Sequence, residues 1–399
     1  MRPILAVLAG KTARFLIRRF RPGGGSALPG TIAATIDPKL LERAVASAAM
    51  GLVVVSGSAG KSTTTKLLVQ LLEAHGLRVF TNPSTANIKQ GLYAAVLQFG
   101  DYQGRINADI VVLEWDEGHG AAMVERLHPK LAILTNVLSD QLDRFIDPEV
   151  VTEKLKAIHD GSLRVVLNAD DKNLCQFADP TKTLGFGLSK DLLPGPSYAL
   201  NFGPHPEIAK RTLVLEVGDR ARIRVGDTEL LANASNAEQA LNVAGALTAL
   251  AEILRPDYKI VQSVLDQPVK VFARDELAEI RGREVRLMLV QNPTSFQLNL
   301  NALTGNENPL MLMAGGDIHD PSWLWQVDFS KLRKVDIVGG RNAHELALVL
   351  RYQGVPYDRI LTEAQDSSEA FLELEGQNPT ILFSADAMRR TRRYLGLAK

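Results

Sequence analysis

A glycine-rich loop, Gly57-Ser58-Ala59-Gly60-Lys61-Ser62, lies between an apolar run that ends at Ser56 and a segment with helical periodicity from Lys61 to His75. Its glycines let backbone amides approach a polyphosphate, while the helix N-terminus and Lys61 supply positive charge. The Ser62 hydroxyl can bind magnesium. The spacing GxxGKS is shorter than the common GxxxxGK[ST], and an ordinary turn is the alternative. The strand–loop–helix context favours a phosphate site.

Further apolar runs follow this loop, end in polar residues and alternate with amphipathic helices. This alternation predicts βαβ units and a mostly parallel sheet, which binds ligands where its strands end. Four polar residues are expected at that edge: Ser56, Glu114, Asn136 and Asn168. Magnesium prefers oxygen ligands, so Glu114, at the end of Asp109–Glu114, is the predicted metal ligand. A solvated acidic loop with Asp116 and Glu117 is the alternative.

The remainder of the chain predicts a hairpin, a long helix and a second series of strands and helices. Alternating residues on both sides of Gly218-Asp219 indicate the hairpin, and Asn236–Leu254 the helix. Gly23–Gly30 is expected to be a flexible break, and Arg255–Pro268 a linker. The second series begins near Val285, which puts a domain boundary near residue 271. The predicted fold class is therefore α/β in both parts.

The first 22 residues combine apolar side chains with interleaved arginines. They predict a helix with two alternative placements. One is peripheral contact with an anionic membrane, and the other, given about twice the weight, is docking on protein. The apolar stretch Pro3–Ala9 is too short for a signal peptide, and no run in the chain has the roughly 18 apolar residues of a transmembrane helix.

Charge and cysteine content exclude several functional classes. The 45 Lys and Arg residues balance the 45 Asp and Glu residues, so nucleic acid is disfavoured as a partner. The single cysteine, Cys175, excludes a disulfide framework and a Cys-based zinc site, and it suits a reducing compartment.

Several motifs together resemble the Mur ligase family, the ATP-dependent ligases of cell-wall synthesis. VVVSGSAGKSTTT is similar to that family's short phosphate loop, with Ala59 and Ser62 in place of the usual Asn and Thr. The chain is most similar to the family's MurT branch. That resemblance covers nearly the whole chain, in order, through Gly23–Pro38, Ala108–Gly118, Thr135–Phe145, Leu167–Asp171, Phe272–Glu276, Leu289–Pro293, Asp320–Phe329 and Gly339–Val355.

The resemblance implies three parts. They are an N-terminal helix with a Gly-rich segment (1–45), a Mur ligase-like ATP-binding central domain (46–270) and a smaller Rossmann-like C-terminal domain (271–399). It also implies ATP and Mg²⁺ as cofactors. The implied nucleotide-binding residues are Gly57, Ser58, Ala59, Gly60, Lys61, Ser62, Thr63, Asn236 and Asn292, and the implied metal ligands are Ser62 and Glu114. Asn236 has a helix cap as its alternative role.

The sequence departs from the MurT pattern at several positions. Gln291 replaces a lysine and Gln326 replaces an aspartate, and the block before Asp320 is shortened. Gln141, in contrast, agrees with the MurT signature and stands where other Mur ligases have a metal-binding histidine. MurT proteins often carry a four-cysteine zinc ribbon, which a chain with one cysteine cannot form, so no zinc ribbon is expected.

The resemblance implies ATP-dependent amidation of the D-glutamate α-carboxyl of lipid II, through an acyl phosphate, in the cytoplasm or at the inner face of the membrane. Ammonia would come from a GatD-like glutaminase subunit. Lys61 and Asp320 are the implied catalytic residues, with Asp320 reaching the partner's site. The alternative for Asp320 is the start of a turn, and core packing is favoured for Trp323 and Trp325.

Two other functions remain open at this point. One is another Mur-type ligase that joins an amino acid or glutamate chain to a carboxylate. The other is a non-catalytic nucleotide-binding scaffold subunit, for which Ala59, Gln291 and Gln326 leave room.

Overall fold

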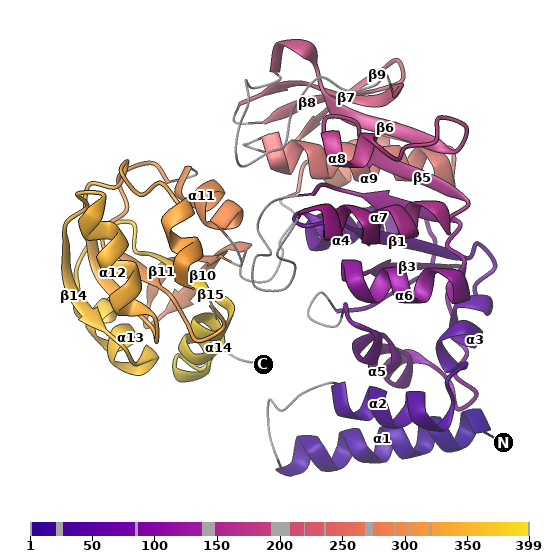
Figure 1. Ribbon diagram of the computed structural model, residues 1–399, viewed down its shortest axis with the longest axis horizontal. Coiled ribbons are helices and arrows are strands. Elements are labelled where there is room, and N and C mark those ends of the chain that lie inside the picture. The colour runs from indigo at the N-terminus through magenta and orange to yellow at the C-terminus, as the bar shows by residue number, and fades with distance from the viewer. Residues whose placement is uncertain are drawn as a thin grey trace. The chain divides into compact units, whose positions relative to one another are not determined.

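A computed structural model describes residues 2–20, 27–83, 87–137, 148–192, 208–218, 220–234, 237–267, 274–290, 293–301, 303–318 and 321–397. The chain forms two compact units, the first built from the elements α1 to α10 and the second from β10 to α14 (Figure 1). Each unit has an α/β fold with its own sheet, which confirms the predicted fold class.

The first unit opens with three helices, α1 (Arg2–Phe20), α2 (Ala27–Ile36) and α3 (Leu40–Ala46). Its sheet has nine described strands in the order β2-β3-β1-β4-β5-β6-β7-β8-β9. The strands are β1 (Leu52–Ser56), β2 (Val79–Thr81), β3 (Ile110–Glu114), β4 (Leu131–Leu134), β5 (Arg164–Asn168), β6 (Thr183–Leu188), β7 (Lys210–Val217), β8 (Ala221–Val225) and β9 (Thr228–Ala232). Pairing is parallel from β2 to β7, and β7, β8 and β9 are antiparallel.

Helices cover both faces of this sheet (Figure 1). They are α4 (Lys61–Ala74), α5 (Lys89–Phe99), α6 (Glu117–Leu127), α7 (Pro148–Asp160), α8 (Lys172–Cys175), the short η1 (Lys190–Leu192), α9 (Ala237–Ile253) and α10 (Tyr258–Leu265). Helices α4 and α9 pack on one face, where leucines of α4 meet the small residues of α9 in a common core. Alanine and glycine on α9 allow this close approach because their side chains are short.

The second unit has six described strands in the order β10-β11-β15-β12-β13-β14. All pairs are parallel except β10 with β11 at one edge. The strands are β10 (Arg274–Ile280), β11 (Arg283–Val290), β12 (Leu310–Met313), β13 (Val335–Gly339), β14 (Tyr357–Leu361) and β15 (Thr380–Ser384). The helices are α11 (Pro293–Asn301), η2 (Pro321–Gln326), α12 (Ala343–Tyr352), α13 (Ala364–Glu373) and α14 (Ala385–Tyr394).

Two segments differ from the prediction. The expected break over Gly23–Gly30 was wrong at its end, because α2 begins at Ala27 and packs against α5. Gly30 permits this contact, since a Cβ there would stand 1.9 Å from the Gln90 carbonyl oxygen. The expected linker Arg255–Pro268 contains α10, whose Val261 and Leu265 are buried in the core. The hairpin predicted at Gly218-Asp219 is confirmed by the pairing of β7 with β8.

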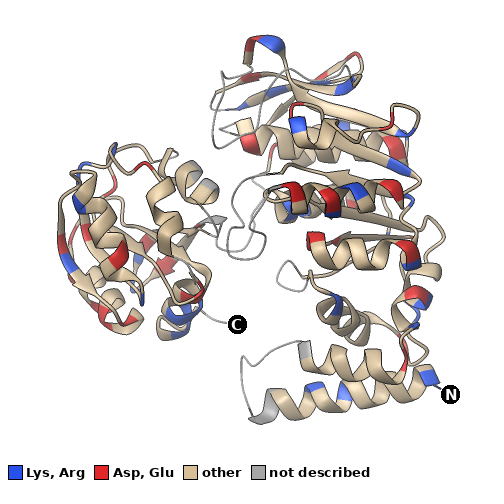
Figure 2. Ribbon diagram, viewed as in Figure 1, with Lys and Arg blue, Asp and Glu red and all other residues tan. Residues whose placement is uncertain are grey.

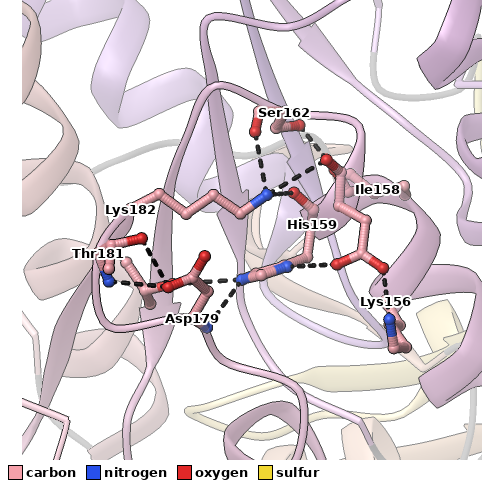
Figure 3. A network of polar contacts seen from close by, with 9 residues as sticks. Lys156, Ile158, His159, Ser162, Asp179, Thr181 and Lys182 are labelled. Atoms are coloured by element: carbon pink, nitrogen blue, oxygen red, sulfur yellow. Dashed lines mark hydrogen bonds and ion pairs between the residues drawn. The ribbon is translucent and has the colours of Figure 1, made fainter.

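A polar network holds the C-terminal end of α7 (Figure 3). Lys182 Nζ donates to the carbonyl oxygens of His159, Asp160 and Ser162 at 2.8, 3.2 and 3.3 Å. A cation at this position donates to carbonyl oxygens that the helix leaves without partners. It also interacts favourably with the negative end of the helix dipole. The backbone N–H of Asp179 donates to His159 Nε2 at 3.3 Å, so Nδ1 carries the ring proton and donates to Asp160 at 2.9 Å. Burial lowers the pKa of His159.

Within the described ranges, none of the helices combines the length and the apolar character that a transmembrane span needs.

Candidate nucleotide and metal site

The phosphate loop lies at the point where the strand order of the first sheet reverses. β1 sits between β3 and β4, and the chain adds later strands on both sides of it. Val55 pairs with Glu114 of β3, and Ser56 pairs with Leu134 of β4. Parallel α/β sheets bind ligands in the crevice beside such a point. The topology therefore brings Ser56, Glu114 and Asn136 to one edge, as the sequence predicted.

The residues after β4 hold the loop backbone. Asn136 accepts from the Ser58 N–H through its carbonyl oxygen at 2.9 Å, and from the Ala59 N–H through Oδ1 at 2.8 Å. The Thr135 hydroxyl donates to the Ala59 carbonyl at 2.6 Å. Gly57 has φ +132°, and a Cβ there would lie 2.2 Å from Thr135 Oγ1. Only glycine lets the loop pass this close to β4.

Lys61 is folded back over its own loop and forms an ion pair with Glu117. Its Nζ lies 2.6 Å from Glu117 Oε1, donates to the Gly57 carbonyl, and reaches the Ser58 carbonyl at 3.3 Å. The Glu117 side chain is fully buried, and that of Lys61 is 12% exposed. Glu117 Oε2 is buried without a hydrogen-bond partner among the described residues. The acidic residue nearest the loop lysine is therefore Glu117, which the sequence had suggested only as part of a solvated loop.

The loop and the start of α4 fit a polyphosphate. The first backbone N–H groups of a helix have no acceptor within it, and α4 begins at Lys61 directly after the loop. Thr63 lies in the same first turn. The cationic Nζ of Lys61, which now pairs with Glu117 Oε1, is a charge that phosphate oxygens can bind in place of this carboxylate.

The oxygen donors beside the loop suit magnesium. Glu114 is buried at the end of β3, and its Oε1 accepts from Asn87 Nδ2 at 3.2 Å. Asn82 bridges the Glu114 backbone, accepting from its N–H at 2.9 Å and donating to its carbonyl at 3.1 Å. Magnesium is usually held by one or two carboxylates together with substrate phosphates, and the predicted ligands Ser62 and Glu114 offer a hydroxyl and a carboxylate of the type it prefers. No cluster of three or more acidic, histidine or cysteine ligands occurs in the described part of the chain.

Helix α9 contributes a buried asparagine that the sequence had not singled out. Asn242 is 5% exposed, and a Cβ on Gly60 would lie 2.0 Å from its Oδ1. The same atom accepts from the Thr64 hydroxyl at 3.4 Å. Asn242 thus packs directly against Gly60 of the loop and binds the first turns of α4. Asn236, predicted to bind the nucleotide, lies outside the described residues, as does Asn292.

The aspartates that follow β5 have structural roles. Asp171 caps α8 through the N–H groups of Asn173 and Leu174 and accepts from the Val137 N–H at 2.7 Å. Burial raises the pKa of Asp171 to about 6. Asp170 pairs with Lys210 and accepts from the Leu188 N–H. Cys175 is buried on α8, and burial raises the pKa of its thiol to about 12.

In the second unit, the two tryptophans of η2 have different environments. Trp323 is buried against Phe296, in agreement with the expected core packing. Trp325 is 46% exposed, so the same expectation was wrong for it. Its ring lies 5.2 Å from that of Tyr352 on α12, edge to face. Asp320 lies outside the described residues.

Comparison with known proteins places both units. The family model described as the Mur ligase middle domain matches residues 55–193, and the MurT ligase C-terminal model matches residues 289–386. The solved structure of a pseudomurein peptide ligase type C from Methanothermus fervidus superposes with a TM-score of 0.70 at 16% identity, over 90% of this chain and 80% of that one. The chain belongs to the Mur ligase family, whose members are carbon–nitrogen ligases that depend on ATP.

Within this family the chain is of the MurT type. It is 27% identical to the MurT subunit of the glutamine-hydrolysing lipid II isoglutaminyl synthase of Streptococcus pneumoniae, over 95% of this chain and 93% of the relative. It is 24% identical to the subunit of the same name from Staphylococcus aureus, over 87% and 86%. The resemblance found in the sequence motifs is thereby confirmed.

Proposed function

We propose that this chain is the ligase subunit of an enzyme that amidates the D-glutamate α-carboxyl of lipid II, with ammonia from a GatD-like glutaminase subunit. The observation that carries the proposal is the joint presence of a Mur-type phosphate loop and a MurT-type C-terminal region in one chain. The proposed division is an ATP-binding region at 46–270 and a region for the glutaminase at 271–399, after an N-terminal part at 1–45.

The reaction has two steps on the substrate. The α-carboxylate attacks the γ-phosphorus of ATP, a C–O–P bond forms, and ADP leaves. Ammonia then attacks the acyl carbon, phosphate leaves, and a proton passes to solvent, which gives the carboxamide. Phosphorylation is needed because a carboxylate is a poor acyl donor. The glutaminase would supply ammonia by hydrolysing glutamine to glutamate.

The residues of the loop take the following roles in this proposal. Backbone N–H groups over residues 57–63 bind the phosphates, and Lys61 exchanges Glu117 for the γ-phosphate oxygens. Ser62 and Glu114 would hold Mg²⁺, which spreads the charge that develops during phosphoryl transfer. Asn236 and Asn292 are proposed to contact the nucleotide. The chemistry takes place on the cytoplasmic side of the membrane, where ATP is present.

Asp320 is proposed to act in the glutaminase site of the partner. A carboxylate that orients a histidine stabilises the imidazolium formed when a neighbouring thiol is activated. We infer that the partner docks near η2, where Trp325, Tyr352 and Leu348 are 46, 79 and 58% exposed. Large aromatic side chains of this kind commonly anchor protein–protein interfaces.

The test is an amidation assay with the chain, a co-purified glutaminase, lipid II, ATP, Mg²⁺ and glutamine, read by mass spectrometry of the lipid product. Lys61→Ala should abolish amidation with either glutamine or ammonium salt, because phosphate charge is no longer compensated. Asp320→Asn should lose only the glutamine-driven reaction. Addition of an amino acid to the lipid would instead identify another Mur-type ligase. Absence of ATP turnover with partner and substrate would identify a scaffold subunit.

A further inference from the structure

Helix α1 is apolar on two opposite sides. Its inner side packs against α2 and α5 through the buried Ala6, Val7 and Gly10, and a Cβ on Gly10 would lie 2.4 Å from a methyl carbon of Leu97. Its outer side exposes Leu5 and Phe15 by 58 and 70%. Five large apolar residues form this outer face: Ile4, Leu5, Leu8, Phe15 and Leu16.

Such a helix is normally covered on both sides. Figure 1 shows α1 as the outermost helix at one end of the first unit, and no described element of that unit lies beyond it. The outer residues lie on one side of the helix at its 3.6-residue period, as two groups separated by the exposed Thr12, so they share one face. This outer face is therefore a candidate binding surface, because its large apolar side chains are exposed.

Basic residues are concentrated in this part of the chain. Lys11 extends over the Tyr102 ring at 4.9 Å, and Arg14 donates to Gln98 Oε1 at 2.7 Å, so both cations lie at the side of α1 that borders α5. Figure 2 shows basic residues on α1 and no acidic residue on the described parts of α1 or α2. The sequence has six Lys and Arg and no Asp or Glu in residues 1–36. The remaining residues carry 39 basic against 45 acidic side chains, so the positive charge is segregated to this end.

We propose that the outer face of α1 binds the surface of a membrane that contains anionic lipid, with the apolar residues of this face in the interface and the net positive charge of residues 1–36 attracting the headgroups. Apolar burial and attraction to anionic lipid act together in such helices. A symmetric dimer through this face would bring like charges together, since the face offers no carboxylate for pairing. The choice of a bilayer rests in part on the proposed function, because a lipid-linked substrate is reached at that surface.

The experiment is co-sedimentation of the full chain with vesicles of phosphatidylcholine, with and without phosphatidylglycerol. We expect binding to the anionic vesicles that weakens as salt is raised. The double variant Leu5→Asp, Phe15→Asp should bind at least tenfold more weakly. The matched control is Leu163→Asp, in a residue that is 68% exposed and lies between α7 and β5, outside α1, which should bind as wild type does.

Several outcomes overturn the proposal. The proposal is wrong if the wild type does not bind anionic vesicles. It is also wrong if the double variant binds them as tightly as the wild type. A concentration-dependent dimer that the double variant loses would assign the face to a second copy, and loss of glutaminase co-purification would assign it to that partner. ATP-induced thermal stabilisation confirms that the variant is folded. Amidation of detergent-solubilised lipid II should be unchanged in the variant, so failure of the membrane proposal is distinguished from failure of the proposed function.

Discussion

The ion pair between Lys61 and Glu117 determines the state of the phosphate loop before nucleotide binds. An ammonium removed from water needs a counter-charge, and Glu117 supplies it at 2.6 Å. Phosphate oxygens must compete with this carboxylate for the same Nζ. Glu117 therefore lowers the net gain from phosphate binding while it stabilises the empty loop.

Glu117→Gln should separate these two effects. The substitution keeps the shape but removes the negative charge that Glu117 presents to Lys61, so the nucleotide-free protein should lose about 3 kcal/mol of unfolding free energy. Mg²⁺-ATP then restores the missing negative charge, and the stabilisation by ATP should exceed that of the wild type. Thermal unfolding with and without Mg²⁺-ATP measures both quantities.

Glu125→Gln is the matched control, because Glu125 lies exposed on the same helix, α6. It should leave both quantities at the wild-type value. An ATP-induced stabilisation in Glu117→Gln that is equal to or smaller than in the wild type would show that the carboxylate does not compete with phosphate.

His159 should make stability depend on pH. Burial lowers the pKa of the folded imidazole below its ordinary value of 6.5, so the unfolded chain binds the proton more readily. The contribution of His159 to stability is present above pH 6.5 and is lost as the pH falls through the lowered pKa. We expect the unfolding free energy of the wild type, measured relative to that of His159→Gln by urea denaturation, to decrease progressively on acidification.

The comparison with the variant is required because Asp171 acts in the opposite sense. Its folded pKa is raised to about 6, so its contribution is present at low pH and is lost as the pH rises through that value. Asp171 is the same in both proteins, and its effect cancels in their difference. A difference that is independent of pH would contradict the role assigned to His159.

At the residue scale, local sequence indicated the loop, Glu114 and Asn136, because strand ends and glycine spacing are visible in a short window. Glu117 and Asn242 were missed for a physical reason. Their partners lie 56 and 178 residues away along the chain, and only the assembled sheet and helices bring them together.

At the scale of elements, the crossing of α2 over α5 depends on Gly30. A Cβ at this position would stand 1.9 Å from a backbone oxygen of α5, and a backbone atom cannot rotate away as a side chain can. We predict that Gly30→Ala costs about 1–3 kcal/mol of unfolding free energy through displacement of α2. Urea denaturation followed by circular dichroism gives the value.

Gly218→Ala provides the comparison for this change. The nearest atom to a Cβ on Gly218 is 3.9 Å away, so the added methyl group meets ordinary space. This variant should lie within about 0.5 kcal/mol of the wild type. If both alanine variants have the same stability, the close helix crossing does not limit the fold.

The helices α2 and α10 were not predicted from the sequence, which had indicated a break and a linker at these positions. Glycine and proline around Ala27 and Arg255 favour breaks in isolation, but tertiary packing overrides the local preference. The buried side chains Ala33, Val261 and Leu265 attach these helices to the rest of the first unit. The parallel strands β1, β3, β4 and β5 were predicted correctly because each is a short apolar run buried on both faces.

On the scale of the whole molecule, each unit has its own core, so we expect two unfolding transitions. Phe329 is fully buried in the second unit and packs edge-on against Phe296. Phe329→Ala should cost about 3–5 kcal/mol in that unit alone. Calorimetry should show one transition displaced and the ATP-sensitive transition unchanged.

Leu348→Ala, in a residue that is 58% exposed on α12, is the control and should shift neither transition. Tryptophan fluorescence assigns the transitions, because Trp115 lies in the first unit and the other two tryptophans lie in the second. Joint displacement of both transitions by Phe329→Ala would mean that the units unfold together.

The buried position of Cys175 makes this chain suitable for site-directed labelling. Its thiol is the single one in the sequence, and a pKa of about 12 leaves almost no thiolate at neutral pH. Maleimide reagents should therefore react very slowly with Cys175. A cysteine introduced at an exposed position should react in preference to it. A fluorophore or spin label at residue 15 or 325 would report local polarity without prior removal of a native cysteine.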